Sequence, residues 1–224
     1  MLWMVIACAP VEEPDRVEVA GVAFRFGSHG ERMPDVEVVS AGGSERTDNE
    51  GVYALSMDAG DSLVVEASAD GFVTMSTAVW LFEDSVQDLN LQMIPDAALW
   101  FYEIALGVTP DPQHCQIATT VHVADIVGLT LEEFVSYGHH GIEGATVTAS
   151  PELPSPVYVS ETYAPDPELA ATTLDGGVVF VNVEPGTYTL TAHHPSVSFD
   201  ELTVTCEAGG FVNAGPPYGL RERP

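Results

Sequence analysis

The sequence contains no lysine and has little positive charge of any kind. Its 224 residues include 34 acidic residues and 6 basic ones, all arginine, for a formal net charge of −28. A surface this negative repels nucleic acids and anionic membranes, so we expect no nucleic-acid partner. The same charge would keep the protein soluble in salt or collect cations. A solubilising surface and a Ca²⁺-dependent surface are therefore both consistent with it.

Catalytic signatures are missing as well. The sequence has no G-x-S-x-G nucleophile elbow, no H-E-x-x-H metal motif and no phosphate-binding P-loop. We therefore expect no enzymatic activity, no catalytic residue and no cofactor, with weakly bound Ca²⁺ as the one exception to consider.

Cysteine is scarce, and the first of the three cysteines lies in a distinctive stretch. Val5-Ile6-Ala7-Cys8 consists of two aliphatic residues, a small residue and cysteine. It resembles the lipobox of bacterial lipoproteins, which implies acylation at Cys8 and attachment to the bacterial cell envelope. The expected location is the outer membrane, on its periplasmic or its surface-exposed face. The preceding residues are too few for a membrane span of roughly 20 residues.

The other two cysteines, Cys115 and Cys206, lie beside strand-like segments. Two cysteines in an exported protein usually pair, so we expect a disulfide between them. A pair of buried free thiols is the alternative.

Short alternating segments dominate the chain. Apolar and polar residues alternate from Val17 to Met93 and again from Gln113 onward, and 20 glycines and 16 prolines separate the segments. This pattern predicts an all-β fold of the sandwich type. The segment Asp96–Leu106 has helical spacing instead, and predicts a short linker helix. The expected divisions are a truncated signal and tether (1–16), a first sandwich (17–94), a helical linker (95–112), a second sandwich with a proline-rich loop (113–214) and a tail (215–224).

A spacing of glycines recurs in the two halves. Gly51 aligns with Gly177, and nine residues later Gly60 aligns with Gly186. Alternating strands follow in both cases. A repeated offset between glycines indicates repeated turns, so the chain is predicted to hold two copies of one fold.

The repeated motifs resemble those of one family. The corner Thr47–Tyr53, the strand start Gly144–Val147 and the hairpin Glu184–Ala192 are similar to the carboxypeptidase-regulatory-like family, which has a transthyretin-like β-sandwich. In the first copy, Ala59-Gly60-Asp61 replaces the Pro-Gly turn of the family. The resemblance implies two tandem Greek-key sandwiches joined by a short helix. It also implies a non-enzymatic surface scaffold or an adhesion or binding module, with a protein or glycan at the cell surface as its partner. The alternative is a carbohydrate- or Ca²⁺-binding accessory module.

Exposed aromatic residues are the best candidates for ligand contacts. Tyr158 and Tyr163 fall in the proline-rich stretch Pro151–Pro167, which is predicted to be an exposed loop with Val157–Glu161 as a candidate edge strand. Packing within the loop is the alternative for both tyrosines. Trp80 could contact a sugar, or fill a core or the junction between the two copies.

Metal ligation is the weaker hypothesis for several polar residues. Two histidine pairs and one acidic corner have suitable side chains, but solvated turns explain the same residues. The candidates are His139, His140, His193, His194, Asp48 and Glu50.

Overall fold

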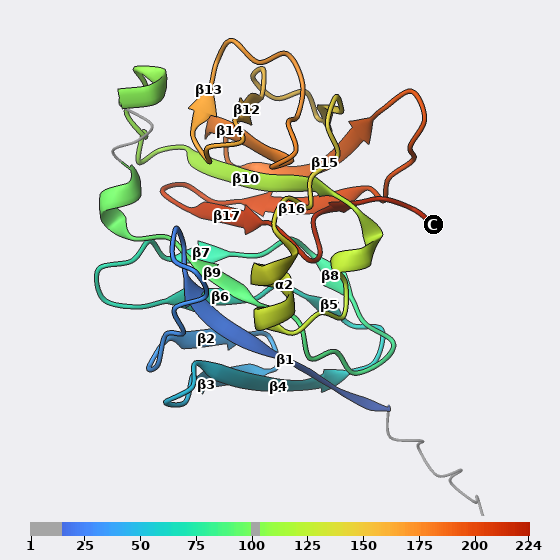
Figure 1. The fold of residues 1–224 in the computed structure, drawn as a ribbon. Helices are drawn as coiled ribbons and strands as arrows, with labels where there is room; N and C mark the ends of the chain where they lie inside the picture. The colour runs from blue at the N-terminus through green and yellow to red at the C-terminus, as the bar shows by residue number, and fades with distance from the viewer. Residues whose placement is uncertain (1–14, 100–103) are drawn as a thin grey trace, which may run out of the picture.

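The computed structural model describes residues 15–99 and 104–224, and it consists mostly of β-strands (Figure 1). The lipidation candidate Cys8 and the middle of the expected linker helix lie outside these residues. Among the described residues, no helix has the length and apolar character needed to cross a membrane. Within the described residues, the helices with both ends defined are the 3₁₀ turns η1 (Asp96–Leu99) and η2 (Ala124–Ile126) and the α-helix α2 (Leu131–Tyr137), and residues 104–106 are also helical. The strands are β1 (Arg16–Arg25), β2 (Glu37–Ser40), β3 (Gly43–Arg46), β4 (Val52–Asp58), β5 (Ser62–Leu63), β6 (Glu66–Ser68), β7 (Met75–Ser76), β8 (Trp80–Leu81), β9 (Leu91–Met93), β10 (Cys115–His122), β11 (Thr146–Ser150), β12 (Val157–Val159), β13 (Pro165–Asp166), β14 (Gly177–Val183), β15 (Gly186–His193), β16 (Leu202–Cys206), β17 (Phe211–Ala214) and β18 (Leu220–Arg221).

The two halves of the chain share one pattern of strand pairing. In the first half β1 pairs antiparallel with β4 and parallel with β9, and β6 lies between β2 and β7. In the second half β10 pairs antiparallel with β14 and parallel with β17, and β15 lies between β11 and β16. Alternating residues of these strands face inward and form two apolar clusters, one centred on each half. The clusters cross the junction, because Val179 and Phe211 belong to the first and Ala78 belongs to the second.

A buried threonine fixes the same corner in each half. The Thr47 hydroxyl donates to the Met33 carbonyl (2.8 Å) and accepts from the Val36 amide (2.9 Å). The Thr172 hydroxyl donates to the Ile142 carbonyl (2.5 Å) and accepts from the Ala145 amide (2.9 Å). Each threonine thereby closes a loop of more than ten residues against its neighbouring strand.

The repeat corrects the alignment of the glycines by one residue. Gly51 (φ 73°) and Gly176 (φ 79°) each lie four residues after the corner threonine, and their carbonyls accept from Ala23 and Val121, respectively. A Cβ at either glycine would lie within 3 Å of a strand carbonyl, which explains the requirement for glycine. Gly51 therefore corresponds to Gly176, where the sequence alignment paired it with Gly177.

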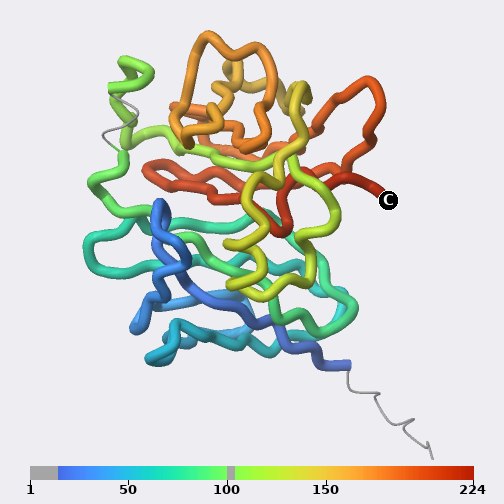
Figure 2. Tube along the Cα trace, viewed as in Figure 1, coloured from blue at the N-terminus to red at the C-terminus, as the bar shows by residue number. Residues whose placement is uncertain are grey.

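A strand pairing between the halves joins them into one sheet. The edge strand β7 pairs in parallel with β17, with Met75 opposite Phe211 and Ser76 opposite Val212. The result is a ten-stranded sheet in the order β13-β12-β14-β10-β17-β7-β6-β2-β3, with β18 attached to β10. Figures 1 and 2 show this pairing at the middle of the molecule, where the red and teal strands meet. The sequence predicted a linker helix and, as one interpretation, a junction contact of Trp80 between the halves, but not this strand pairing.

Cys115 and Cys206 form a disulfide within the second half, as predicted. Both residues are buried, and their Cα atoms are 5.8 Å apart. The bridge joins the first residue of β10 to the last residue of β16, and therefore connects the two facing sheets of this half.

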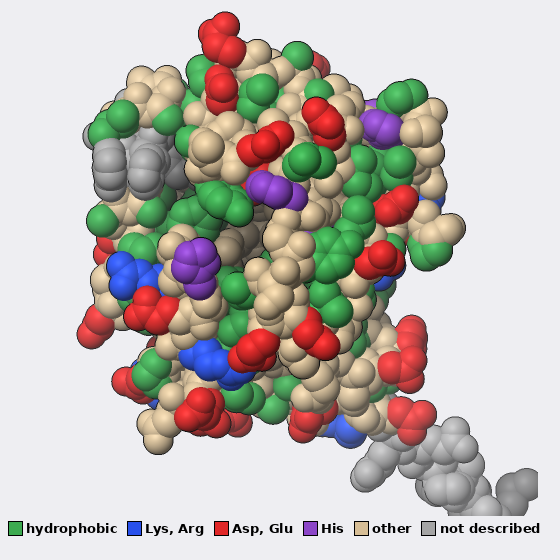
Figure 3. All heavy atoms as spheres, in the orientation of Figure 1, with side chains coloured by type: hydrophobic (Ala, Val, Ile, Leu, Met, Phe, Trp, Pro, Cys, Tyr) green, Lys and Arg blue, Asp and Glu red, His purple; other side chains and the backbone are tan. Residues whose placement is uncertain are grey.

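All six arginines lie within the described residues, and each has a carboxylate partner at 2.5–3.8 Å. The pairs are Arg16–Asp58, Arg25–Glu31, Arg32–Glu132, Arg46 with Asp35 and Glu37, and Arg221 and Arg223 with Asp200. In the face drawn in Figure 3, acidic side chains extend over both halves, and the blue side chains lie beside red ones. Because every guanidinium is already paired, the surface offers no free arginine to an anionic ligand.

We expect the double substitution of Cys115 and Cys206 by alanine to lower the free energy of unfolding. The bridge closes a loop with a sequence separation of 91 residues, which corresponds to at most roughly 4–5 kcal/mol in the chain-entropy model. Urea denaturation of the two proteins measures the difference. An unchanged midpoint in the variant would contradict the expectation. Reductant should shift the midpoint of the wild type only.

Candidate functional site

The junction between the halves is built around a buried carboxylate, Asp88. One carboxylate oxygen accepts from the Tyr218 hydroxyl and the other from the Gly128 amide, both at 2.6 Å. Burial, together with the bond to Asp88, raises the pKa of the Tyr218 hydroxyl far above its usual range, so Tyr218 remains a donor. A residue of the first half is thus held by two separate segments of the second half.

Aromatic rings pack beside this carboxylate. The Tyr218 ring lies 5.6 Å from Trp80 and 5.3 Å from Phe82, with an edge-on contact to Phe82. The indole N–H of Trp80 donates to the Tyr218 carbonyl (3.0 Å). Trp80 is therefore a junction residue, in agreement with the second of its two interpretations.

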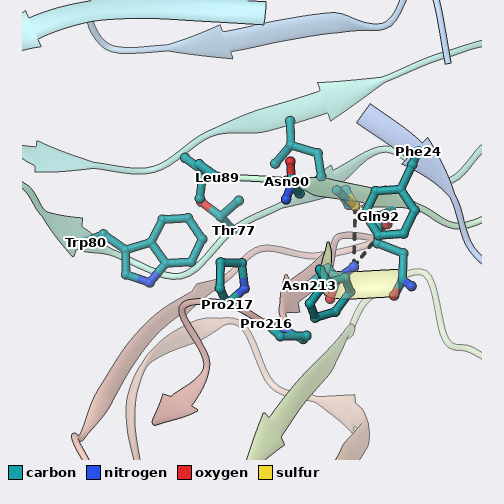
Figure 4. A pocket seen from close by; sticks show the side chains of 13 residues that line it. Phe24, Thr77, Trp80, Leu89, Asn90, Gln92, Asn213, Pro216 and Pro217 are labelled. Carbon is teal, nitrogen blue, oxygen red and sulfur yellow. Dashed lines mark hydrogen bonds between the residues drawn. The ribbon is translucent and has the colours of Figure 1, made fainter. Parts of the chain in front are cut away.

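Residues of both halves, among them Val73, His114 and Phe211, line a hollow of about 210 Å³. A second, much smaller cavity of the junction is shown in Figure 4. The Asn213 amide projects into it and donates to the Gln92 carbonyl (3.1 Å), and Pro216 and Pro217 cover one side. The volume of about 20 Å³ holds roughly one water molecule, so the cavity has no room for a ligand.

Helix α2 covers the junction from outside. Its capping box is complete, since the Thr130 hydroxyl accepts from the Glu133 amide and the Glu133 carboxylate accepts from the Thr130 amide. On this helix Glu132 pairs with Arg32 of the first half (2.5 Å), and Phe134 lines the cavity. The helix therefore connects the second half to the first.

Tyr158 and Tyr163 have different environments, although sequence analysis placed them together. Tyr158 lies on β12, is only 4% exposed, and its hydroxyl accepts from the Val147 amide (3.2 Å). Because β12 pairs with β14, the Tyr158 ring belongs to the core, which corrects its assignment to an exposed ligand-binding loop. Tyr163 is 62% exposed and stacks on the His139 ring, with a centroid distance of 6.4 Å and an interplanar angle of 21°.

The metal-ligand candidates make local hydrogen bonds. The His140 ring bonds to the Gly138 carbonyl (3.1 Å), and His193 bonds to the Thr148 hydroxyl (2.8 Å), while His194 accepts from the Ser196 amide (3.3 Å). Residues 15–99 and 104–224 contain no group of three His, Cys, Asp or Glu side chains placed to hold a metal ion.

The acidic corner has a backbone role. One Asp48 oxygen accepts from the amides of Glu50 and Val52, both at 2.9 Å. This bonding shapes the turn before β4, in agreement with the alternative interpretation of Asp48 and Glu50 as turn residues.

His122, which no sequence motif singled out, is fully buried under the C-terminal segment. Its Nδ1–H donates to the Val123 carbonyl (2.8 Å), and its Nε2 accepts from the Gly219 amide (3.2 Å). Burial lowers the pKa of this imidazole to about 4, against a smaller opposing effect of the bond to Val123. The only sequence signal was a histidine at an alternating position of a predicted strand.

His114 is held between two carboxylates near the start of β10. Its Nε2 lies 3.0 Å from Glu184. Its Nδ1 lies 3.1 Å from Asp111, without hydrogen-bond geometry. The bond to Glu184 and the charges of both acids raise the pKa of His114, and burial opposes them. This contact connects the linker to the β14–β15 turn.

No protein-family model and no curated protein matches the chain. Solved structures give weak likenesses. The TIE protein of Bacillus anthracis is 11% identical, with 93% of this chain and 34% of that chain covered and a TM-score of 0.30. GBS52, the minor pilin of Streptococcus agalactiae, is 10% identical, with 93% and 97% covered and a TM-score of 0.30. The shaft pilin spaA of Lactobacillus rhamnosus GG is 7% identical, with 90% and 98% covered and a TM-score of 0.25. The chain spans about a third of the Bacillus anthracis protein.

Tyr218→Phe should destabilise the protein by about 1–3 kcal/mol. The substitution keeps the ring contacts but leaves one oxygen of the buried Asp88 carboxylate without its hydroxyl donor. Chemical denaturation gives the difference. Tyr137→Phe is the matched control, because Tyr137 is 42% exposed and its change should stay within about 0.5 kcal/mol. Equal effects of the two substitutions would contradict a structural role for the bond to Asp88.

Stability should fall as the pH drops from about 6.5 toward 4. The pKa of His122 is about 4 in the folded protein and about 6.5 in an unfolded chain, so the unfolded state binds the proton first. The neutral, buried His122 contributes on the order of 3 kcal/mol to the free energy of unfolding. This contribution is fully present above pH 6.5 and is lost progressively as the pH falls toward 4. Denaturation curves between pH 4 and 7 measure the slope. His122→Asn should flatten this slope, whereas His29→Asn, at an exposed loop, should leave it unchanged. An equal slope in both variants would rule out His122 as its source.

Proposed function

We propose that this chain is a non-enzymatic scaffold or adhesion module of the bacterial cell surface. In this proposal two transthyretin-like halves form one rigid body, and a lipid on Cys8 holds it at the envelope. The observation that carries the proposal is the sheet that continues from the first half into the second through β7 and β17.

Rigidity is the property that a scaffold needs, and the junction supplies it by several means. Domains of one chain usually move relative to each other unless their interface is large and apolar. Here a backbone ladder, the buried Asp88 carboxylate and the Trp80–Tyr218 contact all connect the halves. A surface carried on the second half would therefore keep a fixed orientation relative to the first half.

Two further features fit an exported protein. A buried disulfide is stable in oxidising compartments such as the periplasm or the cell surface. The acidic surface, with its arginines paired, suppresses non-specific association with anionic polymers and membranes.

A carbohydrate-binding accessory module is the second candidate function. The observation that favours it is the exposed Tyr163 ring beside His139. Ca²⁺ binding at Asp48 and Glu50 has less support, because one oxygen of the Asp48 carboxylate already accepts from two backbone amides.

We expect protein from the native membrane fraction to carry an acylated Cys8 as its first residue. Intact-mass spectrometry should find a mass gain consistent with acyl chains and the loss of Met1–Ala7. Cys8→Ser should release the protein from membranes, with Cys115 and Cys206 still bridged. An unmodified N-terminus in a cytoplasmic fraction would contradict the envelope location.

Residual dipolar couplings test the rigid body. Amides of the two halves should fit a single alignment tensor, because the shared sheet prevents independent reorientation. Two tensors of different magnitude would remove the argument for a scaffold.

A further inference from the structure

An exposed tyrosine occupies an unfavourable backbone conformation at the tip of the β12–β13 hairpin. Tyr163 has a φ of 63°, in the left-handed region that residues other than glycine and asparagine avoid. Its amide donates to the Ser160 carbonyl (2.9 Å), and the Ser160 amide donates to the Ala164 carbonyl (2.8 Å), so the turn is fixed. With 62% of its surface exposed, the side chain gains little packing in return. The fold therefore does not explain why this position is tyrosine.

The segments around this turn carry a second ring and a further exposed apolar side chain. His139 follows the end of α2 and stacks on Tyr163 at 6.4 Å. Leu174 is 41% exposed, and its carbonyl accepts from the Gly141 amide (2.9 Å). The neighbouring Thr173 hydroxyl donates to the Val159 carbonyl at the base of the hairpin (2.8 Å). We call His139, Tyr163 and Leu174, which lie on three segments connected by these bonds, the Tyr163 tip.

Charge restricts the ligands that the Tyr163 tip can accept. The tip contains no arginine, and all six arginines are paired with carboxylates elsewhere. The net charge of −28 disfavours phosphate, sulfate and uronic-acid groups. Nucleobases would also stack on an exposed ring, but their phosphate backbone would be repelled.

We infer that the Tyr163 tip binds a neutral glycan. The apolar face of a pyranose packs on flat aromatic rings. The Tyr163 ring is exposed and is oriented by its stacking on His139, and the unfavourable backbone conformation of Tyr163 is typical of a binding site. The Glu161 carboxylate, in the same turn and exposed, can accept hydrogen bonds from sugar hydroxyls. This inference rests on the second candidate function above and assigns it a site and a ligand class.

The test uses purified full-length protein and three neutral hexasaccharides, cellohexaose, maltohexaose and chitohexaose, with a hyaluronan hexasaccharide as the anionic comparator. We expect at least one neutral probe to bind in calorimetric titration and to shift the Tyr163 and His139 ring resonances. Tyr163→Asn should weaken binding at least tenfold, because asparagine tolerates the left-handed conformation but has no ring. Leu81→Asn is the matched control: Leu81 is 65% exposed on β8 in the first half, and its loss should leave binding unchanged.

Four results would overturn the inference. These are the absence of binding by all three neutral probes, equal binding by the anionic probe, wild-type affinity in Tyr163→Asn, and a marked fall of the melting temperature in that variant. The last result would show that the ring serves the fold. Because these measurements do not depend on where the protein resides, their failure leaves the scaffold proposal intact. Conversely, a cytoplasmic location would leave the binding result intact.

Discussion

The structure depends on two residue pairs between the edge strands β7 and β17. An unpaired edge strand exposes a row of backbone donors and acceptors, and proteins usually cover such edges. Here each half covers an edge of the other. This pairing holds the halves side by side, and Asp88 and Trp80 of the first half both form hydrogen bonds to Tyr218 of the second. One sheet therefore spans both halves of the molecule, although its strands belong to two similar patterns.

The two halves differ in the strand that follows β2 in the first half and β11 in the second half. In the first half this strand, β3, forms a hairpin with β2 and stays on the same sheet. In the second half the chain leaves β11, passes through the proline-rich stretch and pairs as β12 with β14 on the opposite sheet. The β12–β13 hairpin that carries Tyr163 is part of this segment and has no counterpart in the first half. The recognition surface that we propose therefore lies on the segment in which the two halves differ. The threonine corners at Thr47 and Thr172, in contrast, have the same hydrogen bonds in both halves.

Local patterns in the sequence were sufficient to predict the strand-rich fold and the Cys115–Cys206 bridge. Both predictions rest on signals that are local or compositional: alternation, turn residues and the number of cysteines. The pairing of β7 with β17 left no such signal, since it joins Met75 and Ser76 to Phe211 and Val212, residues 136 positions apart that belong to no common motif. Tyr158 was misplaced because prolines on both sides suggested a loop with at most an edge strand, whereas β12 is paired on both sides and buries this ring. The one-residue error at Gly177 has a related cause: adjacent glycines leave the register open, and a shift of one residue exchanges the faces of a strand. His122 and Asp88 were missed because their roles depend on partners that only the folded chain brings near.

The junction also has a consequence for the order in which the chain can fold. Tyr218 is synthesised 130 residues after Asp88. At about 5–20 residues per second, this delay is roughly 6–26 s. During this interval the first half can form its own sheets, but the β7 edge and the rings of Trp80 and Phe82 remain uncovered. A nascent chain of this protein therefore exposes an unpaired strand edge and apolar rings, which favour aggregation, until its second half has been synthesised. A holding chaperone would be most useful in that period, before the two halves have met.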